Sequence, residues 1–191
     1  MSARPGLFPA FLKLSGRRVL VVGGGPMAAS KIQALADAGA RVTVVAPEVR
    51  PEIEAAGVTV FRRAFAAEDL DGAWFVVAAA TPEVNEQVAR AAEDRRVFVN
   101  AVDDPRRASA YLGGVVRRSG VTLAISTDGE APALAGLLRE AFDAVLPADL
   151  DAWVAEARRV KTGWRRDGVP MERRRPLLLE ALNDLYRRAA P

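Results

Sequence analysis

Residues 17–25 read RRVLVVGGG, an apolar strand pattern that ends at three consecutive glycines. A continuous β-branched run of this kind is typical of a strand that is buried on both faces. Apolar residues then recur at helical spacing over residues 27–38, and a second apolar run occupies residues 41–46. A strand, a helix and a strand within about 30 residues predict two parallel strands joined by a right-handed crossover.

The alternation of strand and helix continues to residue 100. Further strands are predicted at residues 58–61, 74–79 and 97–100, with a helix at residues 84–93. Strands that alternate with helices form a parallel sheet, so the predicted fold class is α/β, with a doubly wound sheet of the Rossmann type. In such sheets, ligands bind beyond the carboxyl ends of the strands.

The pattern changes after Pro105, and we expect a domain boundary near residues 105–112. Two apolar segments, residues 111–116 and 121–126, flank the sequence RRSG, which predicts a β-hairpin. Three helices are predicted to follow, at residues 133–146, 150–164 and 177–188. Because two strands are only marginally stable by themselves, the hairpin should need another sheet or another subunit.

The chain contains no cysteine and no histidine. Disulfide bonds, thiolate nucleophiles and imidazole as a base or metal ligand are therefore excluded. Proton transfer has to rely on Asp, Glu, Lys, Tyr or water, and we predict no resident metal site.

Charge and hydropathy restrict the partners. No run of about 18 uncharged apolar residues is present, and the N-terminus lacks an apolar segment of secretory length, so we expect a soluble protein without a membrane partner. The net charge of +3 comes from the C-terminal tail. Basic residues there alternate with acidic ones and form no recognised motif, so a nucleic-acid partner is not expected.

The glycine triplet fits the pattern Gly-x-Gly-x-x-Ala of dinucleotide-binding loops through Gly23, Gly25 and Ala28. Gly23 would allow a tight turn, Gly25 would let the backbone approach a pyrophosphate, and Ala28 would let the helix lie close to the strand. Pro26 suits the first helical position, and Met27 follows it in the same turn. We predict that this loop binds a dinucleotide; the alternative is a merely structural turn.

The residues after the second and fourth strands complete the predicted cofactor site. In dinucleotide-binding folds an acidic residue at the end of the second strand usually binds the ribose. This chain has no acidic residue at that point and reads Ala46-Pro47-Glu48. Ribose contact from Glu48, or from the backbone of Ala46 and Pro47, is the expectation. No Arg occupies residues 45–49, which favours NAD over NADP. Thr81 offers a hydroxyl after the fourth strand, although it could equally serve as the N-cap of the next helix.

The stretch FVNAVDDP ends the fifth strand with two adjacent carboxylates, Asp103 and Asp104. A carboxylate at the carboxyl end of a strand, in a chain without imidazole, can take part in proton transfer. Asp104 precedes Pro105 and is more typical of a turn residue. The alternative is that Asp103 and Asp104 only form a turn and have no catalytic role.

With the glycine loop, the sequences AAAT, VNAVDDP and LAISTDGEAPALAGLLRE follow in order. In this combination the chain resembles the precorrin-2 dehydrogenase and sirohydrochlorin ferrochelatase family, which includes the N-terminal module of bacterial sirohaem synthase. The resemblance implies a cytoplasmic enzyme of sirohaem biosynthesis that uses NAD to oxidise precorrin-2, a tetrapyrrole, to sirohydrochlorin. In many members Fe²⁺ insertion follows. A non-catalytic NAD-sensing module is the alternative.

The resemblance also implies roles for individual residues. The family's key aspartate falls on Asp103, and Ser126 and Thr127 match a loop at the substrate site, where hydroxyl and N–H groups suit a carboxylate-rich ligand. Asp128 replaces a family glycine; its alternative role is a helix-capping acid. The family's Phe-x-x-Pro is absent, and Tyr111 could supply the missing ring from one position over.

The family's quaternary structure implies an intertwined homodimer. The expected division is an NAD-binding Rossmann domain at residues 1–110, a dimerisation region with the substrate loop at 111–147, and a helical C-terminal domain at 148–191. The methyltransferase domain of sirohaem synthase is not expected within these residues. Arginines near the site could bind the acidic substrate, namely Arg106, Arg107, Arg117 and Arg118.

Overall fold

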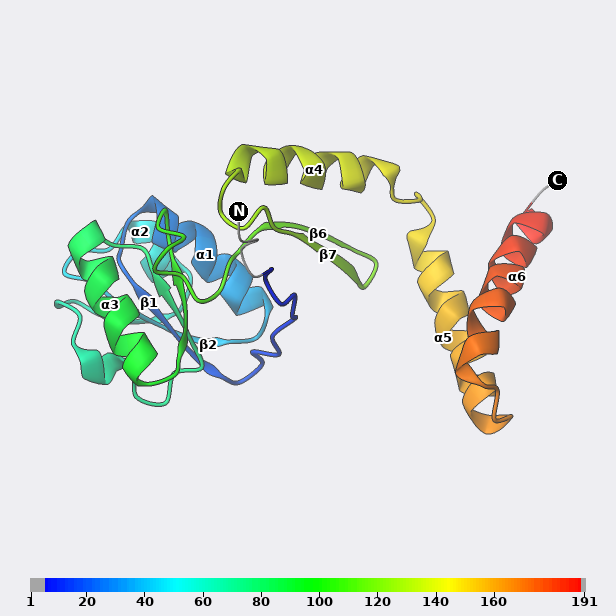
Figure 1. The fold of residues 1–191 in the computed structure, drawn as a ribbon, viewed down its shortest axis with the longest axis horizontal. Coiled ribbons are helices and arrows are strands. Elements are labelled where there is room, and N and C mark those ends of the chain that lie inside the picture. Colours follow the sequence, from blue (N-terminus) through cyan, green and yellow to red (C-terminus); the bar gives the residue numbers. More distant parts are fainter. Residues whose placement is uncertain (1–5, 190–191) are drawn as a thin grey trace. The chain divides into compact units, whose positions relative to one another are not determined.

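The computed structural model describes residues 6–189. The chain divides into two compact units (Figure 1). The first unit comprises Met1–Leu112 together with the turn Asp128–Glu130, and the second comprises Gly113–Thr127 and Ala131–Pro191.

A five-stranded parallel sheet forms the centre of the first unit, with the strand order β3-β2-β1-β4-β5. The strands are β1 (Arg18–Val22), β2 (Arg41–Val45), β3 (Thr59–Phe61), β4 (Phe75–Ala78) and β5 (Phe98–Ala101). The helical elements are α1 (Pro26–Asp37), α2 (Pro51–Ala55), the 3₁₀ helix η1 (Ala67–Leu70) and α3 (Pro82–Asp94). The prediction of a Rossmann-type parallel sheet is confirmed; α2 and η1 were not predicted.

The core lies on both faces of this sheet. Val19 and Val21 of β1 point toward a cluster that includes Ile32 of α1, whereas Leu20 packs with Val88 of α3 on the opposite face. All five of these side chains are at most 1 % exposed. Figure 1 shows α1 and α3 on opposite sides of the sheet. Alternate residues of β1 are thus buried against different helices, which is why residues 19–22 are all apolar and only Arg18, at the start of the strand, is polar.

Asp69 is the most deeply buried ionisable side chain among the described residues, since it is only 7 % exposed. Its Oδ2 accepts a hydrogen bond from Arg63 Nη1 at 2.8 Å and another from the N–H of Ala66 at 2.9 Å. The hydrogen bond from Arg63 is the main cause that lowers the pKa of the Asp69 carboxyl below its usual range. The ionised carboxylate therefore stabilises the turn before β4.

The substitution Asp69→Ala is expected to lower the free energy of unfolding by about 2 kcal/mol at neutral pH, because it leaves the Ala66 N–H without its partner. The pKa of Asp69 is lower in the folded protein than in the unfolded chain, where it is near 4. The ionised carboxylate therefore adds to the free energy of unfolding above about pH 4, and this stabilisation is lost as the pH falls through the pKa of the folded protein. Urea unfolding at pH 7 and pH 3 checks this. A wild-type to mutant difference that does not shrink at pH 3 would contradict it.

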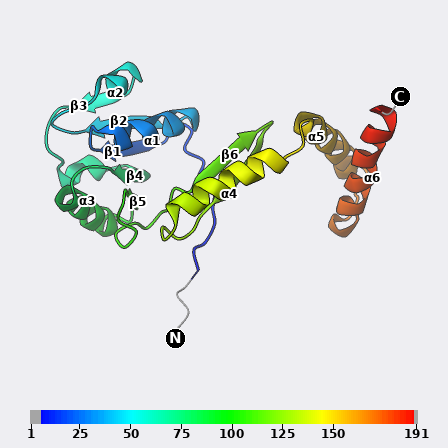
Figure 2. The same ribbon diagram turned by 90° about the horizontal axis from the view of Figure 1, so that it is seen from above.

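The second unit begins with an antiparallel hairpin, β6 (Gly114–Arg118) and β7 (Val121–Ile125). Helix α4 (Pro132–Val145) lies along this hairpin (Figure 2). Helices α5 (Leu150–Arg166) and α6 (Met171–Ala189) pack against each other. Trp153 and Tyr186 join them through a hydrogen bond of 2.6 Å from Trp153 Nε1 to the tyrosine hydroxyl.

Helix α6 begins six residues earlier than predicted and contains Pro176. The prediction started the helix after this proline because an interior proline removes one hydrogen bond and clashes with the preceding turn. Pro176 lies in the second turn, where only the carbonyl of Glu172 loses its helical partner. The guanidinium of Arg174 donates to the carbonyl of Val169 at 3.0 Å and fastens the start of the helix.

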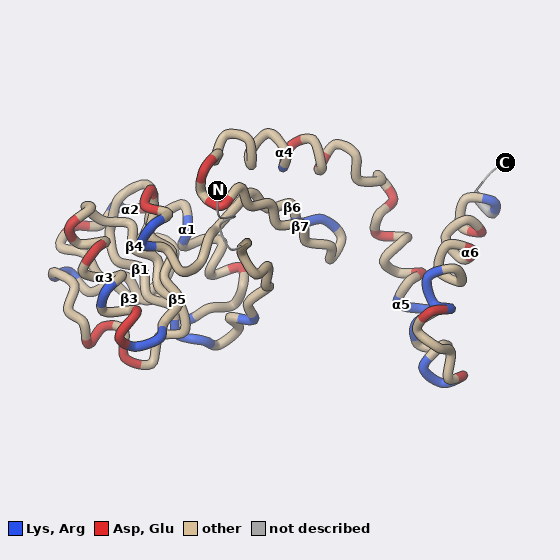
Figure 3. Tube along the Cα trace, in the orientation of Figure 1, with Lys and Arg blue, Asp and Glu red and all other residues tan. Residues whose placement is uncertain are grey.

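Basic and acidic residues are mixed along α5 and α6 (Figure 3). Ion pairs join Arg159 to Glu156, Arg166 to Asp167 and Arg187 to Asp184. This mixture is typical of a solvated helix surface. Over residues 6–189, no helix has both the length and the apolar sequence needed to cross a membrane.

Candidate dinucleotide and substrate site

The glycine loop follows β1 and leaves no room for side chains at its first two positions. Gly23 has φ 121°, and a Cβ there would lie 2.1 Å from the carbonyl oxygen of Ala79. A Cβ on Gly24 would lie 1.9 Å from the carbonyl oxygen of Glu48. We assigned no role to Gly24 from the sequence, although its place in a glycine triplet could have indicated one. The turn is therefore tightly enclosed by the segments that follow β2 and β4.

Gly25 differs from these two glycines, because a Cβ there would meet nothing within 4 Å. Gly25 is the N-cap of α1, so no N-cap side chain occupies the N–H groups at the helix end. No acidic residue lies in the first turn of the helix either. Pro26 occupies the first helical position as predicted, and Met27 is exposed beside it. Open space, free N–H groups and an uncapped helix N-terminus fit the pyrophosphate of a dinucleotide.

The predicted ribose side of the site lies after β2. Ala46 is buried and donates its N–H to the carbonyl of Phe61 at 3.2 Å. Pro47 and Glu48 are exposed, so the Glu48 carboxylate is accessible to a ligand. The N–H of Arg50 donates to the carbonyl of Gly24 at 3.0 Å, which fastens this segment to the glycine loop. The structure thus brings Glu48 next to the loop that holds Gly25.

Thr81 occupies the N-cap position of α3, as the alternative prediction stated, but its side chain makes no capping hydrogen bond. Its hydroxyl instead contacts the Glu83 carboxyl, whose pKa is lowered mainly by the Glu83 N–H and further by Thr81. Asn85 was not assigned a role from the sequence. It is 5 % exposed, and its Oδ1 accepts from the N–H of Ala80 at 2.9 Å, which fixes the loop after β4.

Asp103 lies at the same edge of the sheet as the glycine loop. The register aligns Val22 of β1 with Ala78 of β4 and Ala78 with Ala101 of β5, so all three strands end at one level. At about 4.8 Å between neighbouring strands, β1 and β5 are about 10 Å apart. Asp103 lies two residues after the end of β5. It is therefore within reach of a ligand that binds at Gly25 and extends along this edge of the sheet.

The conformation of Asp103 is unusual. Its φ is 60°, in the left-handed region, its side chain is exposed, and it makes no hydrogen bond or ion pair with the described residues. Aspartate tolerates this region better than most residues, but the conformation still has a cost, and such positions concentrate at functional sites. The carboxylate is therefore available to an external ligand.

Asp104 has structural partners, unlike its neighbour. Its carboxylate accepts from the Arg107 guanidinium, and this hydrogen bond is the main cause that lowers the pKa of Asp104. Arg107 also forms an ion pair of 3.1 Å with Glu86 of α3. Arg107 thus clamps the loop after β5 to α3 and is engaged by two carboxylates, whereas Arg106 is exposed.

Ser126 and Thr127 belong to the second unit, at the end of β7. Ser126 is exposed, and Thr127 Oγ1 accepts from the N–H of Ala131 at 3.3 Å. The N-cap of α4 is Ala131, so the alternative role of Asp128 as the capping acid is wrong. Asp128 has φ 55°, which explains physically why glycine suits this position.

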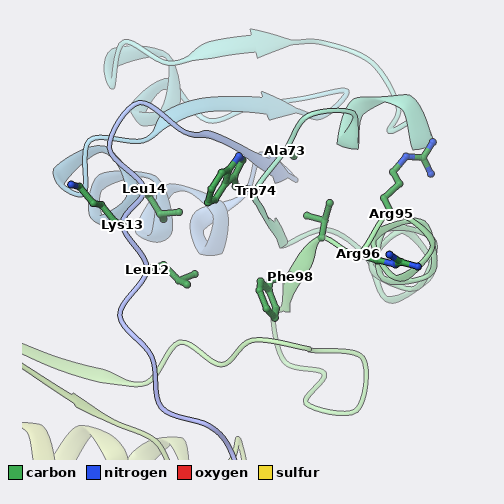
Figure 4. A pocket seen from close by; sticks show the side chains of 9 residues that line it. Leu12, Lys13, Leu14, Ala73, Trp74, Arg95, Arg96 and Phe98 are labelled. Carbon is green, nitrogen blue, oxygen red and sulfur yellow. The ribbon is translucent and has the colours of Figure 1, made fainter.

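A hollow of about 330 Å³ lies at the opposite, amino-terminal edge of the sheet and is lined by residues that include Leu12, Trp74 and Phe98 (Figure 4). The charged ends of Lys13 and Arg96 point away from it (Figure 4). A ligand site normally needs polar groups that converge on it. We therefore assign no ligand to this hollow. In the part of the chain that the structure describes, no cluster of acidic side chains could hold a metal ion.

A parallel sheet with an open, uncapped glycine loop at its carboxyl edge defines a dinucleotide-binding protein of the Rossmann type. Residues 10–114 match the protein family described as putative NAD(P)-binding, which confirms the predicted nicotinamide cofactor. The solved structure of SirC, a precorrin-2 dehydrogenase, is 30% identical, with a TM-score of 0.73 over 95% of this chain and 92% of that chain. The chain belongs to the precorrin-2 dehydrogenase and sirohydrochlorin ferrochelatase family, as its motifs predicted.

Curated relatives agree with this family. The chain is 46% identical over 154 residues to siroheme synthase 3 of Aeromonas hydrophila, which covers 78% of this chain and 33% of that protein. It is 38% identical over 183 residues to the siroheme synthase of Photorhabdus laumondii, with 93% of this chain and 39% of that protein covered. The chain thus spans about a third of the length of these relatives.

Proposed function

We propose that this protein is an NAD-dependent precorrin-2 dehydrogenase that oxidises precorrin-2 to sirohydrochlorin in the cytoplasm. The observation that carries the proposal is Asp103, an exposed carboxylate without a partner at the same edge of the sheet as the open glycine loop. The likeness to SirC, a precorrin-2 dehydrogenase, supports the choice of reaction. A non-catalytic NAD-sensing module would need the loop but would not need the unpaired acid.

In the proposed reaction the substrate loses two electrons and two hydrogens, one as hydride and one as a proton. NAD, when bound, accepts the hydride. The backbone of Gly25 and the first turn of α1 would hold the pyrophosphate of the cofactor, and Glu48 or the backbone of Ala46 and Pro47 would contact its ribose. Thr81 would offer the cofactor a hydroxyl. The Asp103 carboxylate orients the macrocycle and takes the proton.

Substrate binding is proposed to use Ser126 and Thr127, whose hydroxyl groups and neighbouring N–H groups suit the carboxylates of the tetrapyrrole. Arg106 and Arg117 are exposed and can contribute charge. Arg107 is less available, because Asp104 and Glu86 already occupy its guanidinium.

The proposal is tested by incubating the protein anaerobically with precorrin-2 and NAD and following NADH and sirohydrochlorin together. Equal amounts of both products are expected, in parallel with the loss of precorrin-2. If the protein binds NAD but forms neither product, the NAD-sensing module is the correct reading. NADP in place of NAD is expected to react less well, since no Arg occupies residues 45–49.

Fe²⁺ insertion is the second activity that we propose for the same site. The metal is a substrate here, held by the pyrrole nitrogens, and Asp103 would take the protons that they release. Adding Fe²⁺ or Co²⁺ to the sirohydrochlorin that forms separates the two reactions. Metal uptake at the spontaneous rate would assign chelation to another protein.

We also propose that the protein acts as a homodimer. Helix α4 carries an apolar face at helical spacing that includes Leu134, Leu137, Phe142 and Val145, which are 45–73% exposed. Exposed apolar patches of this kind mark association sites. A second copy of the chain is the occupant that we propose for this face.

The substitution Leu137→Glu is expected to convert the dimer into a monomer, because it puts a charge into the centre of the proposed interface. Light scattering coupled to gel filtration measures the mass directly. Asp143→Lys changes the charge on the opposite side of α4, at 100° per residue, and should leave the dimer intact. A wild-type protein that is monomeric at micromolar concentration would contradict the proposal.

A further inference from the structure

The loop that carries Asp103 is closed at its base by the segment that returns beside β5. The N–H of Ser109 donates to the carbonyl of Val99 at 2.9 Å, and the N–H of Val99 donates to Ser109 Oγ at 2.9 Å. The side-chain amide of Asn100 donates to the carbonyl of Ala110 at 3.0 Å. The position of Asp103 therefore depends on what holds the residues between β5 and Ser109.

Arg107 holds the loop at Asp104, which it joins to Glu86 of α3. Tyr111 holds the next residue, because its hydroxyl donates to the carbonyl of Pro105 at 2.7 Å. Pro105 lies two residues after Asp103. These two contacts directly after Asp103 are consistent with a backbone that has to be kept in the left-handed region there, where φ is 60°.

The Tyr111 ring also packs tightly against the turn at Gly129. A Cβ on Gly129 would lie 3.2 Å from Tyr111 Cε1 and 2.8 Å from Pro105 Cγ, and Gly129 has φ 76°. Tyr111 thus links the Asp103 loop to the Asp128–Glu130 turn, which follows Ser126 and Thr127 in the sequence. The ring explains the close packing, whereas the hydroxyl supplies the directional contact to Pro105.

We infer that Tyr111 is a positioning residue for the proposed oxidation, and the inference rests on that proposed function. Its hydroxyl holds the carbonyl of Pro105 and, through it, the left-handed turn that presents the Asp103 carboxylate to the substrate. Tyr111 acts through Asp103 and needs no contact with substrate or cofactor. Without the hydroxyl the ring still packs, but the loop samples orientations in which the carboxylate is not in place.

The test is Tyr111→Phe, alone and combined with Asp103→Asn. In the wild-type background kcat is expected to fall about fivefold, which corresponds to one neutral hydrogen bond of about 1 kcal/mol, with KM and the Kd for NAD within twofold. In the Asp103→Asn background the same change should cost nothing further, because the group that it positions has been removed. Tyr186→Phe removes the chain's other tyrosine hydroxyl and should leave kcat unchanged.

Hydrogen exchange tests the inference without the reaction. The N–H groups of Arg106 and Arg107 bond to Asp104 at 3.2 Å within the loop, and Tyr111→Phe should speed their exchange while leaving the β5 amides unchanged. Unchanged loop exchange, an unchanged kcat, or an equal fivefold loss in the Asp103→Asn background would each overturn the inference. If the wild-type protein fails to oxidise precorrin-2, the proposed function falls, and the exchange data still decide whether Tyr111 holds the loop.

Discussion

Replacing Asp103 with asparagine is expected to lower kcat for precorrin-2 oxidation by about a hundredfold or more, which is the usual loss when a general base is removed. Asparagine keeps the size of the side chain and also tolerates the left-handed conformation at this position, so the loop should keep its shape. The Kd for NAD should be unchanged, because the glycine loop and α1 are untouched. Steady-state kinetics with precorrin-2, together with calorimetric titration of NAD, measures both quantities.

Asp94→Asn is the matched control. Asp94 is an exposed acid at the end of α3, and its replacement makes the same chemical change at the opposite edge of the sheet. Its kcat should equal that of the wild type. If Asp103→Asn keeps more than about a third of the wild-type kcat, Asp103 is a turn residue, and the proton has to go to another group or to water.

The second large effect is expected at the glycine loop, where Gly25→Ala should weaken NAD binding by about tenfold or more and leave the fold intact. The new methyl group has open space in the free protein, since nothing lies within 4 Å. The same methyl group would stand where the pyrophosphate approaches the backbone. Titration calorimetry gives the Kd for NAD, and thermal unfolding without NAD should give a melting temperature close to that of the wild type.

Gly24→Ala is the contrasting variant. Its Cβ would lie 1.9 Å from a backbone carbonyl oxygen, so the loop or the segment after β2 has to move, and a loss of several kcal/mol of stability is expected. The two variants separate a ligand-binding glycine from a structural one. If Gly25→Ala binds NAD as tightly as the wild type, the loop is only a structural turn.

Much of the first unit could be predicted because its information is local. The β-branched runs around Val21, Val44 and Val77 are continuous, and strands buried on both faces need that pattern. The positions of the glycine loop and of Asp103 at one edge then follow from parallel strand direction alone. The tetrapyrrole substrate could be predicted only from the family motifs, because the periodicity of apolar residues gives no information about a ligand.

Other features depend on tertiary contacts that no local pattern carries. The clamp of Arg107 between Asp104 and Glu86 joins residues that are far apart in sequence, and one arginine among 24 gives no signal for it. The enclosure of Gly24 depends on where the segment after β2 passes. The start of α6 was misplaced because an interior proline usually ends a helix, whereas here it lies in the second turn.

The central claim is that Asp103 faces a tetrapyrrole held beside the nicotinamide at the carboxyl edge of the sheet. A crystal structure with NAD and sirohydrochlorin tests it most directly. We predict that the pyrophosphate lies on the Gly25 backbone and that the Asp103 carboxylate lies within about 3 Å of a ring nitrogen or its bound water. A macrocycle bound elsewhere, with Asp103 directed into solvent, would contradict the account.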